Sequence, residues 1–167
     1  AANTQYVIPV GVDKYTSPTG SFAPFKYDYI QLISYDSNVN VTINNNLSAP
    51  VNFLLDKGDT YSSRGKINFV ERLDLTVSIR SGTTITANGR VAALLFTAGP
   101  NRYQSRDYTL LPQNFLSNDY VTNVHGPNSG GIVRPVNLYL FNPHPASLTV
   151  TSYDSVGSRT IVIPPGS

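Results

Sequence analysis

The stretch that decides the fold is Thr83–Gly99, "TTITANGRVAALLFTAG". Its run 91–96, "VAALLF", is continuously apolar, which is typical of a central strand buried on both faces; a short buried helix is the alternative. Because Asn-Gly precedes the run and Ala-Gly-Pro follows it, we favour the strand. We also expect 83–88 and 90–99 to form a hairpin, since Asn-Gly is the strongest two-residue hairpin signal.

Outward from this stretch, the chain consists of short apolar segments separated by turns. Twelve Pro and twelve Gly interrupt the sequence so often that no long helix fits. A helical turn is expected only at 112–117. Between the turns, β-branched and aromatic residues alternate with polar ones, as in strands with one buried face. The other expected strands span 5–10, 27–34 and 38–43 (a hairpin), 51–61, 67–80, 134–142, 147–154 and 159–165.

Ten to twelve short, mostly antiparallel strands predict an all-β fold, a β-sandwich or jelly roll. The 167 residues contain no linker-like segment, so residues 1–167 are expected to form a single domain. Strand, loop, hairpin and strand recur in the same order at an offset of about 105–114 residues, which favours a weak internal duplication joined by 62–118. The tetrapeptide "SYDS" occurs at 34–37, an expected hairpin turn, and again at 152–155, one strand later.

The composition excludes several kinds of partner. Only 13% of the residues are charged, and the 12 Lys and Arg are scattered singly, so we expect no nucleic-acid partner. No apolar stretch reaches the ~18–20 residues of a membrane span. The absence of cysteine excludes disulfides and thiolate metal sites. This composition favours an exported bacterial protein, extracellular or on the cell surface; the start "AANTQ" either follows a signal cleavage or is a trimmed end.

The sequence offers little for catalysis. His125 and His144 each lie in a Pro- or Gly-rich loop, and Glu71 is the only glutamate, so no glutamate pair is available for glycoside hydrolysis. No G-x-S-x-G segment is present. We therefore expect that the protein is not an enzyme.

A calcium site is the one cofactor that the residues suggest. Asp36, Asn38 and Asn40 form a D-x-N-x-N array that resembles the start of an oxygen-ligand loop. No glycine or bidentate glutamate follows at the required place, so the array is not an EF-hand. The alternative interpretation is a turn in which these side chains bond the backbone.

The strongest candidate for a binding surface is "NRYQSRDY" (101–108), which follows the expected central strand. Tyrosine supplies flat, partly polar contact area and arginine supplies a fork of donors, which suits a glycan or a protein partner. The residues proposed to bind are Arg102, Tyr103, Arg106 and Tyr108. The alternative is that they cover the sheet. "FKYDY" (25–29) is a second aromatic cluster.

The N-terminal segment "AANTQYVIPV" is extended and apolar. Such a segment can add to the sheet edge of a neighbouring molecule, and an open sandwich exposes such edges. We expect assembly of this kind to use Gln5, Tyr6, Val7 and Ile8.

Three segments, "VNFLLDKGDTYS" (51–62), "LDLTVSIRSGTTITANGRVAALLFTAG" (73–99) and "LLPQNFLSNDYVTNV" (110–124), resemble in this order the N-terminal domain of IgG-Fc-binding-type proteins. That domain occurs in mucus proteins and large bacterial surface proteins, and the resemblance covers roughly residues 50–165. Val77 stands where the pattern has glycine, and Arg90 where it has proline. The resemblance implies an extracellular, non-enzymatic adhesive or structural domain, and it transfers no binding residues.

Together these observations predict a secreted or cell-surface bacterial structural or adhesive module that acts by binding or self-assembly. Its partner would be another protein or further copies of the chain. The alternative is a carbohydrate-binding module of an extracellular protein.

Overall fold

The computed structural model describes residues 3–14, 25–63, 78–99, 106–121, 138–154 and 157–167. These residues form an all-β protein: about half of them lie in strands, and none lies in an α-helix. Every strand pair is antiparallel. In this part of the chain no helix has the length and apolar character needed to cross a membrane.

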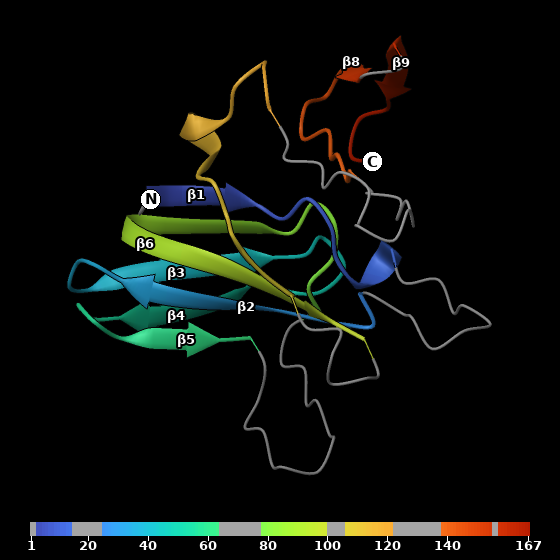
Figure 1. Ribbon diagram of the computed structural model, residues 1–167. Helices are drawn as coiled ribbons and strands as arrows, with labels where there is room; N and C mark the ends of the chain where they lie inside the picture. The colour runs from blue at the N-terminus through green and yellow to red at the C-terminus, as the bar shows by residue number, and fades with distance from the viewer. Residues whose placement is uncertain (1–2, 15–24, 64–77, 100–105, 122–137, 155–156) are drawn as a thin grey trace, which may run out of the picture.

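Seven strands form one sheet, and the last two form a separate hairpin (Figure 1). The sheet has the order β4-β3-β6-β2-β5, and β1 and β7 also pair with β6, which curls the sheet into a nearly closed, barrel-like form. Two short 3₁₀ helices are η1 (Val12–Lys14) and η3 (Gln113–Phe115). The strands are β1 (Asn3–Val7), β2 (Tyr27–Ser34), β3 (Val39–Asn44), β4 (Val51–Leu55), β5 (Thr60–Ser62), β6 (Thr84–Ala98), β7 (Arg106–Thr109), β8 (Leu148–Asp154) and β9 (Gly157–Ile163).

The segment quoted first is one long bent strand, so the predicted hairpin at Asn88-Gly89 is wrong. Residues 84–87 of β6 pair with β3 and, on the other edge, with β1, whereas residues 91–98 pair with β2. The hairpin turn favoured by Asn-Gly requires positive φ at both residues, and neither Asn88 nor Gly89 has it. In Figure 1, β6 reverses its direction at this bend.

Packing and side-chain hydrogen bonds hold the bend. A Cβ atom on Gly89 would lie 2.6 Å from Val39 Cγ2, so glycine is needed here for close approach. The Asp36 carboxylate accepts the backbone N–H of Arg90 at 2.8 Å, and Asn88 Oδ1 accepts the N–H of Asn40 at 2.8 Å. These bonds satisfy donors that a regular ladder would otherwise pair.

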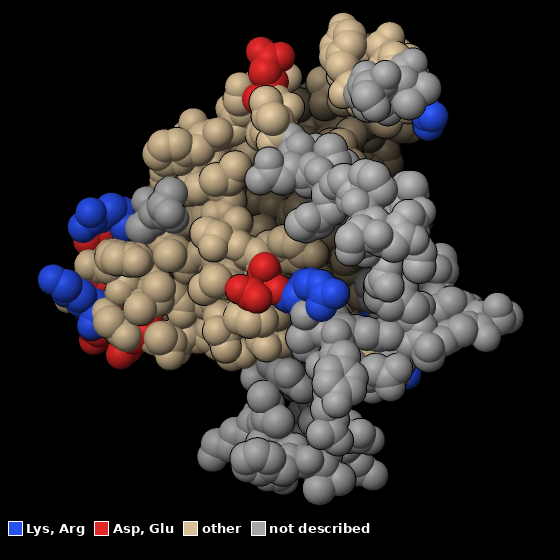
Figure 2. Space-filling view, viewed as in Figure 1, with Lys and Arg blue, Asp and Glu red and all other residues tan. Residues whose placement is uncertain are grey.

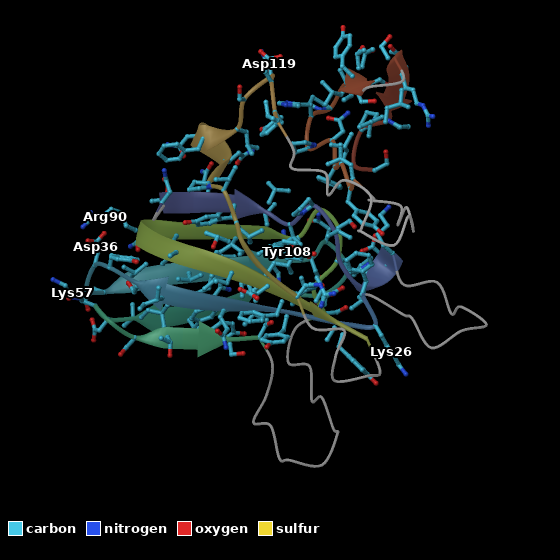
Figure 3. All side chains as sticks on the ribbon, viewed as in Figure 1. Lys26, Asp36, Lys57, Arg90, Tyr108 and Asp119 are labelled. Atoms are coloured by element: carbon cyan, nitrogen blue, oxygen red, sulfur yellow. The ribbon has the colours of Figure 1, made fainter. Side chains whose placement is uncertain are left out.

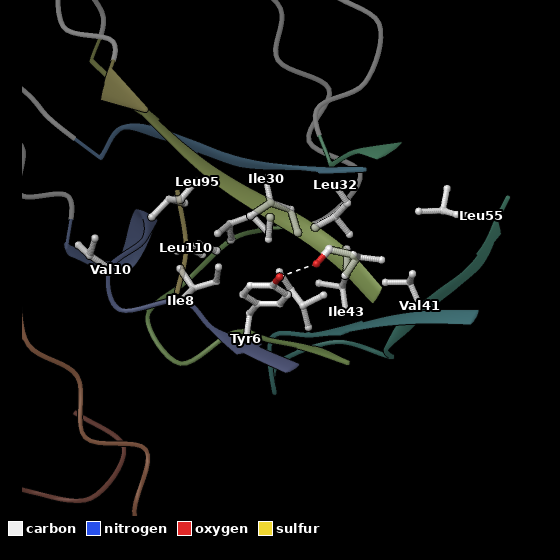
Figure 4. Packing of buried hydrophobic residues seen from close by; sticks show 14 of the residues in the cluster. Tyr6, Ile8, Val10, Ile30, Leu32, Val41, Ile43, Leu55, Leu95 and Leu110 are labelled. Atoms are coloured by element: carbon white, nitrogen blue, oxygen red, sulfur yellow. Dashed lines mark hydrogen bonds between the residues drawn. The ribbon is translucent and has the colours of Figure 1, made fainter. Parts of the chain in front are cut away.

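Both halves of β6 contribute side chains to a single hydrophobic core. Side chains alternate along the whole strand, so odd-numbered residues such as Ile85, Val91 and Leu95 are buried. Tyr6 of β1 is 1% exposed, and its hydroxyl donates a hydrogen bond to the carbonyl of Val91 (Figure 4). The buried cluster consists of Tyr6, Ile8, Val10, Phe25, Ile30, Leu32, Val39, Val41, Ile43, Leu55, Ile79, Ile85, Val91, Ala93, Leu95 and Leu110.

The predicted strands at 27–34 and 38–43 are confirmed as β2 and β3, but their hairpin is wrong. Each pairs with a different half of β6, and the segment 35–38 passes the bend between them. The expected strand 51–61 is divided by a turn, with Gly58 at φ 88°, into β4 and β5. β5 pairs with β2, and β4 pairs with β3, so the two strands lie in opposite halves of the sheet.

The C-terminal strands are confirmed as β8 and β9, and the helical turn as η3. The internal duplication stays a prediction; among the described residues, 138–141, which it aligns with part of β2, form no strand. Residues 152–154 of the second "SYDS" form the end of β8 and pair with β9, whereas the first "SYDS" begins at the last residue of β2 and precedes β3, and these two strands do not pair with each other. The expected strand at 67–80 lies outside the described residues except for 78–80, which are not in a strand.

Replacing Gly89 with alanine is expected to destabilise the protein by about 1–3 kcal/mol, because the new methyl group overpacks the contact with Val39. Urea unfolding measures the free energy. Thr86→Ala, an exposed position on the same strand, is the control and is expected to change it by no more than about 0.5 kcal/mol. Equal stability of Gly89→Ala and the parent protein would contradict the close-packing role.

Candidate functional site

The predicted calcium array lies at the bend of β6. Arg90 Nη2 lies 2.8 Å from Asp36 Oδ1, and Arg90 Nε donates to Asp36 Oδ2 at 3.2 Å. These hydrogen bonds lower the pKa of Asp36 to about 2. Asn38 has a φ of 55°, and its N–H donates to Asp56 Oδ1 at 3.0 Å. The observed bonds give the array a structural role, and calcium binding by Asp36, Asn38 and Asn40 stays a prediction.

Charged side chains of both signs lie close together at this end of the sheet. Figure 3 labels Asp36, Lys57 and Arg90 close together there, and Figure 2 shows that most other described atoms on this face belong to uncharged residues. In the described part of the chain, no group of three or more His, Cys, Asp or Glu side chains has the arrangement of a metal site.

The structure describes two of the four predicted binding residues. Arg106 and Tyr108 lie on β7, and both are exposed; Arg102 and Tyr103 lie outside the described residues. Because the two described residues are separated by one position on a strand, their side chains point to the same side of it. β7 pairs with β6, and within the described residues no other strand pairs with its second edge. The structure thus brings together two of the four residues.

The N-terminal segment predicted to assemble with a neighbour is part of the protein's own sheet. Gln5 and Val7 pair with Thr86 and Thr84 of β6. Tyr6 and Ile8 are buried in the core. Donation of this strand to another molecule would therefore require its removal from its own sheet.

The candidate catalytic residues form no site that the structure describes. His144 is exposed, and its backbone N–H donates to Asn142 Oδ1 at 3.0 Å. His125 and Glu71 lie outside the described residues.

A buried carboxylate is the feature that sequence reasoning missed. Asp28 of β2 is 0% exposed and lies opposite Thr97 of β6. Within the described residues, neither of its carboxylate oxygens has a hydrogen-bond partner. A signal was present, because Asp28 shares the apolar face of the predicted strand 27–34 with Ile30 and Leu32, but the sequence pattern assigned this aspartate no role.

The surroundings of Asp28 disfavour its charged form. Burial, and to a lesser extent the negative charge of Asp13, raise the pKa of Asp28 to about 8. Asp13 lies on η1, where its Oδ1 accepts the backbone N–H of Ser81 at 2.6 Å. Burial is the largest single effect on Asp13 and raises its pKa, but the hydrogen bonds from Ser81 and the charge of Lys14 together outweigh burial and lower the pKa.

The C-terminal hairpin is the second missed feature. β8 and β9 pair over seven positions and project from the seven-stranded sheet (Figure 1). The side chains of Tyr153, Ile161 and Val162 are 82%, 52% and 64% exposed. The strand pattern predicted these two strands, but it contained no information on their separation from the sheet.

A buried asparagine fixes the base of the hairpin. Asn142 Nδ2 donates to the carbonyls of Ala146 and Ile163 at 2.8 and 3.0 Å. Its backbone N–H donates to the Ser167 carbonyl at 3.1 Å, and its carbonyl accepts from Gly166 at 2.9 Å. These bonds tie together both ends of the hairpin.

The segment before Asn142 attaches the hairpin to the main sheet. The rings of Tyr139 and Phe25 meet edge to face, with centroids 5.0 Å apart. The ring of Phe141 lies so close to Gly82 that a Cβ atom there would be 2.6 Å from Phe141 Cζ. The hairpin is therefore held at its base while its strands remain exposed.

Comparison of the chain with protein-family models, curated proteins and solved structures finds no match. The resemblance to the IgG-Fc-binding-type domain stays a prediction from the sequence.

Asp28 makes stability depend on pH. Its pKa is 3.8 in the unfolded chain and about 8 in the folded protein. Between these values the folded state keeps a proton that the unfolded state has lost, so the free energy of unfolding falls as pH rises, by up to about 1.4 kcal/mol per pH unit. Urea unfolding between about pH 4.5 and 8.5, with a chelator present, measures this slope.

Asp28→Asn is expected to remove most of the slope. Asp36→Asn is the control: the pKa of Asp36 is lowered, so its contribution is lost only as pH falls below the unfolded value, and the slope should persist. An unchanged slope in Asp28→Asn would contradict the assignment.

Proposed function

We propose that the protein is a structural or adhesive module, of β-sandwich type, that works by self-association through its C-terminal hairpin. We further propose that it is bacterial and acts outside the cell or on its surface. The low charge, the absence of cysteine and the resemblance to surface-protein domains support this location. The partner is a second copy of the chain.

The exposed hairpin carries this proposal. A two-stranded hairpin without further packing is marginally stable in water. Here three large side chains, Tyr153, Ile161 and Val162, stay exposed on strands whose anchoring contacts, among the described residues, lie at the base. Arg159 is the only Lys or Arg in β8 and β9. A surface of this kind gains free energy when a partner covers it.

The second copy is favoured because one chain offers two complementary elements. β7 has an edge that no described strand covers, and the β8–β9 hairpin has two such edges. Pairing the hairpin of one copy with β7 of the next would satisfy backbone groups on both. Because the two surfaces differ, the contact is head to tail, and repeated contacts give a ring or a filament.

The triple variant Tyr153→Ser, Ile161→Ser, Val162→Ser is expected to weaken self-association at least about 10-fold, since each side chain removed contributes buried apolar area. Sedimentation velocity over a range of concentrations measures this. Leu47→Ser is the matched control: Leu47 is apolar and 69% exposed, but lies in the loop between β3 and β4. A parent protein that stays monomeric, or a triple variant that associates like the parent, would refute the proposal.

Disulfide trapping tests the head-to-tail geometry, and the chain has no cysteine of its own. Oxidising a mixture of Asp107→Cys and Ser158→Cys should yield mainly the mixed dimer. Leu47→Cys in place of Asp107→Cys should yield little. Equal yields would contradict pairing between the hairpin and β7.

A carbohydrate-binding module is the second candidate, because Arg106 and Tyr108 are exposed on one side of β7. If a glycan binds there, a glycan array will show a ligand for the parent protein, and Tyr108→Ala will reduce that binding at least about 10-fold through loss of the ring contact. Tyr153→Ala, which removes an exposed tyrosine on the hairpin, should bind normally. Normal binding by Tyr108→Ala would remove this candidate site.

A further inference from the structure

The carboxylate of Asp28 lies inside the protein, and no group in the described part of the chain satisfies it. It is fully buried, and both oxygens lack a hydrogen-bond partner. Burial of an unpaired carboxylate is strongly unfavourable unless a counter-charge or hydrogen bonds compensate. The carboxylate is therefore the first indication of a ligand at this end of the core.

A bound proton would compensate only in part. It would remove the charge, but the new O–H would have no acceptor, because neither oxygen lies within hydrogen-bond geometry of another group. In the described part of the chain no lysine or arginine pairs with Asp28: Lys14 Nζ lies 3.9 Å from Asp13 Oδ2, and Lys26 Nζ lies 5.3 Å from the centre of the Tyr27 ring. A cation from solution can satisfy both the charge and the lone pairs.

Further oxygen donors lie within electrostatic range of this carboxylate. Asp13 is near enough for its charge to raise the pKa of Asp28, and its Oδ1 is fixed by the Ser81 N–H. The Ser81 hydroxyl is buried close enough to the Asp13 carboxylate to help lower its pKa, but it makes no hydrogen bond of regular geometry in the described structure. η1 is fixed over this segment because the N–H of Val12 donates to the Ile79 carbonyl at 3.0 Å.

We propose that Asp28, Asp13 and Ser81 bind a divalent cation of the calcium type at the end of the core. The donors are carboxylate and hydroxyl oxygens, and the chain has no cysteine, so the site suits a hard cation. Calcium accepts a mixed and irregular set of oxygen ligands, whereas magnesium demands a near-ideal octahedron. The site is separate from both the Asp36 array and the hairpin.

Calcium titration of the chelator-treated protein tests the proposal. Saturating calcium is expected to raise the melting temperature by about 5 °C, because it binds the folded state alone, and magnesium is expected to do less. Terbium, which substitutes for calcium, should give luminescence sensitised by tyrosines such as Tyr27 and Tyr29, which flank Asp28. Calcium should displace it.

Asp28→Asn and Asp13→Asn are expected to lose both responses. Asp28→Asn keeps the size of the side chain and is uncharged at every pH, so it should fold about as well as the calcium-free parent, in which Asp28 is protonated below about pH 8. Asp119→Asn, far from the core on an exposed segment (Figure 3), is the matched control and should respond like the parent.

Three results would overturn the proposal. One is a parent protein whose melting temperature and terbium emission do not respond to metal. Another is an Asp28→Asn variant that responds like the parent. The third is loss of the response in Asp36→Asn but not in Asp28→Asn, which would locate the cation at the bend of β6.

Discussion

The structure depends on one strand that pairs with four others. β6 contributes its first half to β1 and β3 and its second half to β2 and β7, so every strand of the large sheet pairs with β6 or with one of its neighbours. Its bend is possible because Gly89 admits Val39 and because Asp36 and Asn88 satisfy backbone donors there. The same unbroken alternation of side chains then gives one core for both halves.

The carboxylates at the bend and at the opposite end of the sheet differ in exposure and in their partners. At the bend, Asp36 lies at the surface with an arginine partner. At the other end of β2, six residues before the "SYDS" tetrapeptide begins, Asp28 is enclosed with no partner among the described residues. A surface carboxylate paired in this way holds a backbone segment in place, whereas an enclosed one disfavours its own ionisation. The two aspartates of one strand region therefore serve opposite physical roles.

The alternation of apolar and polar residues was sufficient to predict the all-β class and most strand positions, including β2, β3, β8 and β9. It failed at Asn88-Gly89, because the local turn preference was outweighed by packing against Val39, a residue about fifty positions away. The predicted pairing of β2 with β3 was wrong for the same reason, because both strands pair with β6, which is distant in the sequence. Asp28 was visible as a charged residue on an apolar face. The exposure of the hairpin could not be predicted from the sequence, because it depends on which surfaces remain uncovered after folding.

The central place of β6 has a consequence for the order of events during synthesis. β1, β2 and β3 all leave the ribosome before the strand with which each must pair, and residue 98 must emerge before the last of those pairings can form. Until then only the local β3–β4 and β2–β5 pairings are available. Folding dominated by such distant pairings is slow, so the chain is synthesised well beyond its first five strands while their apolar faces are still accessible to chaperones.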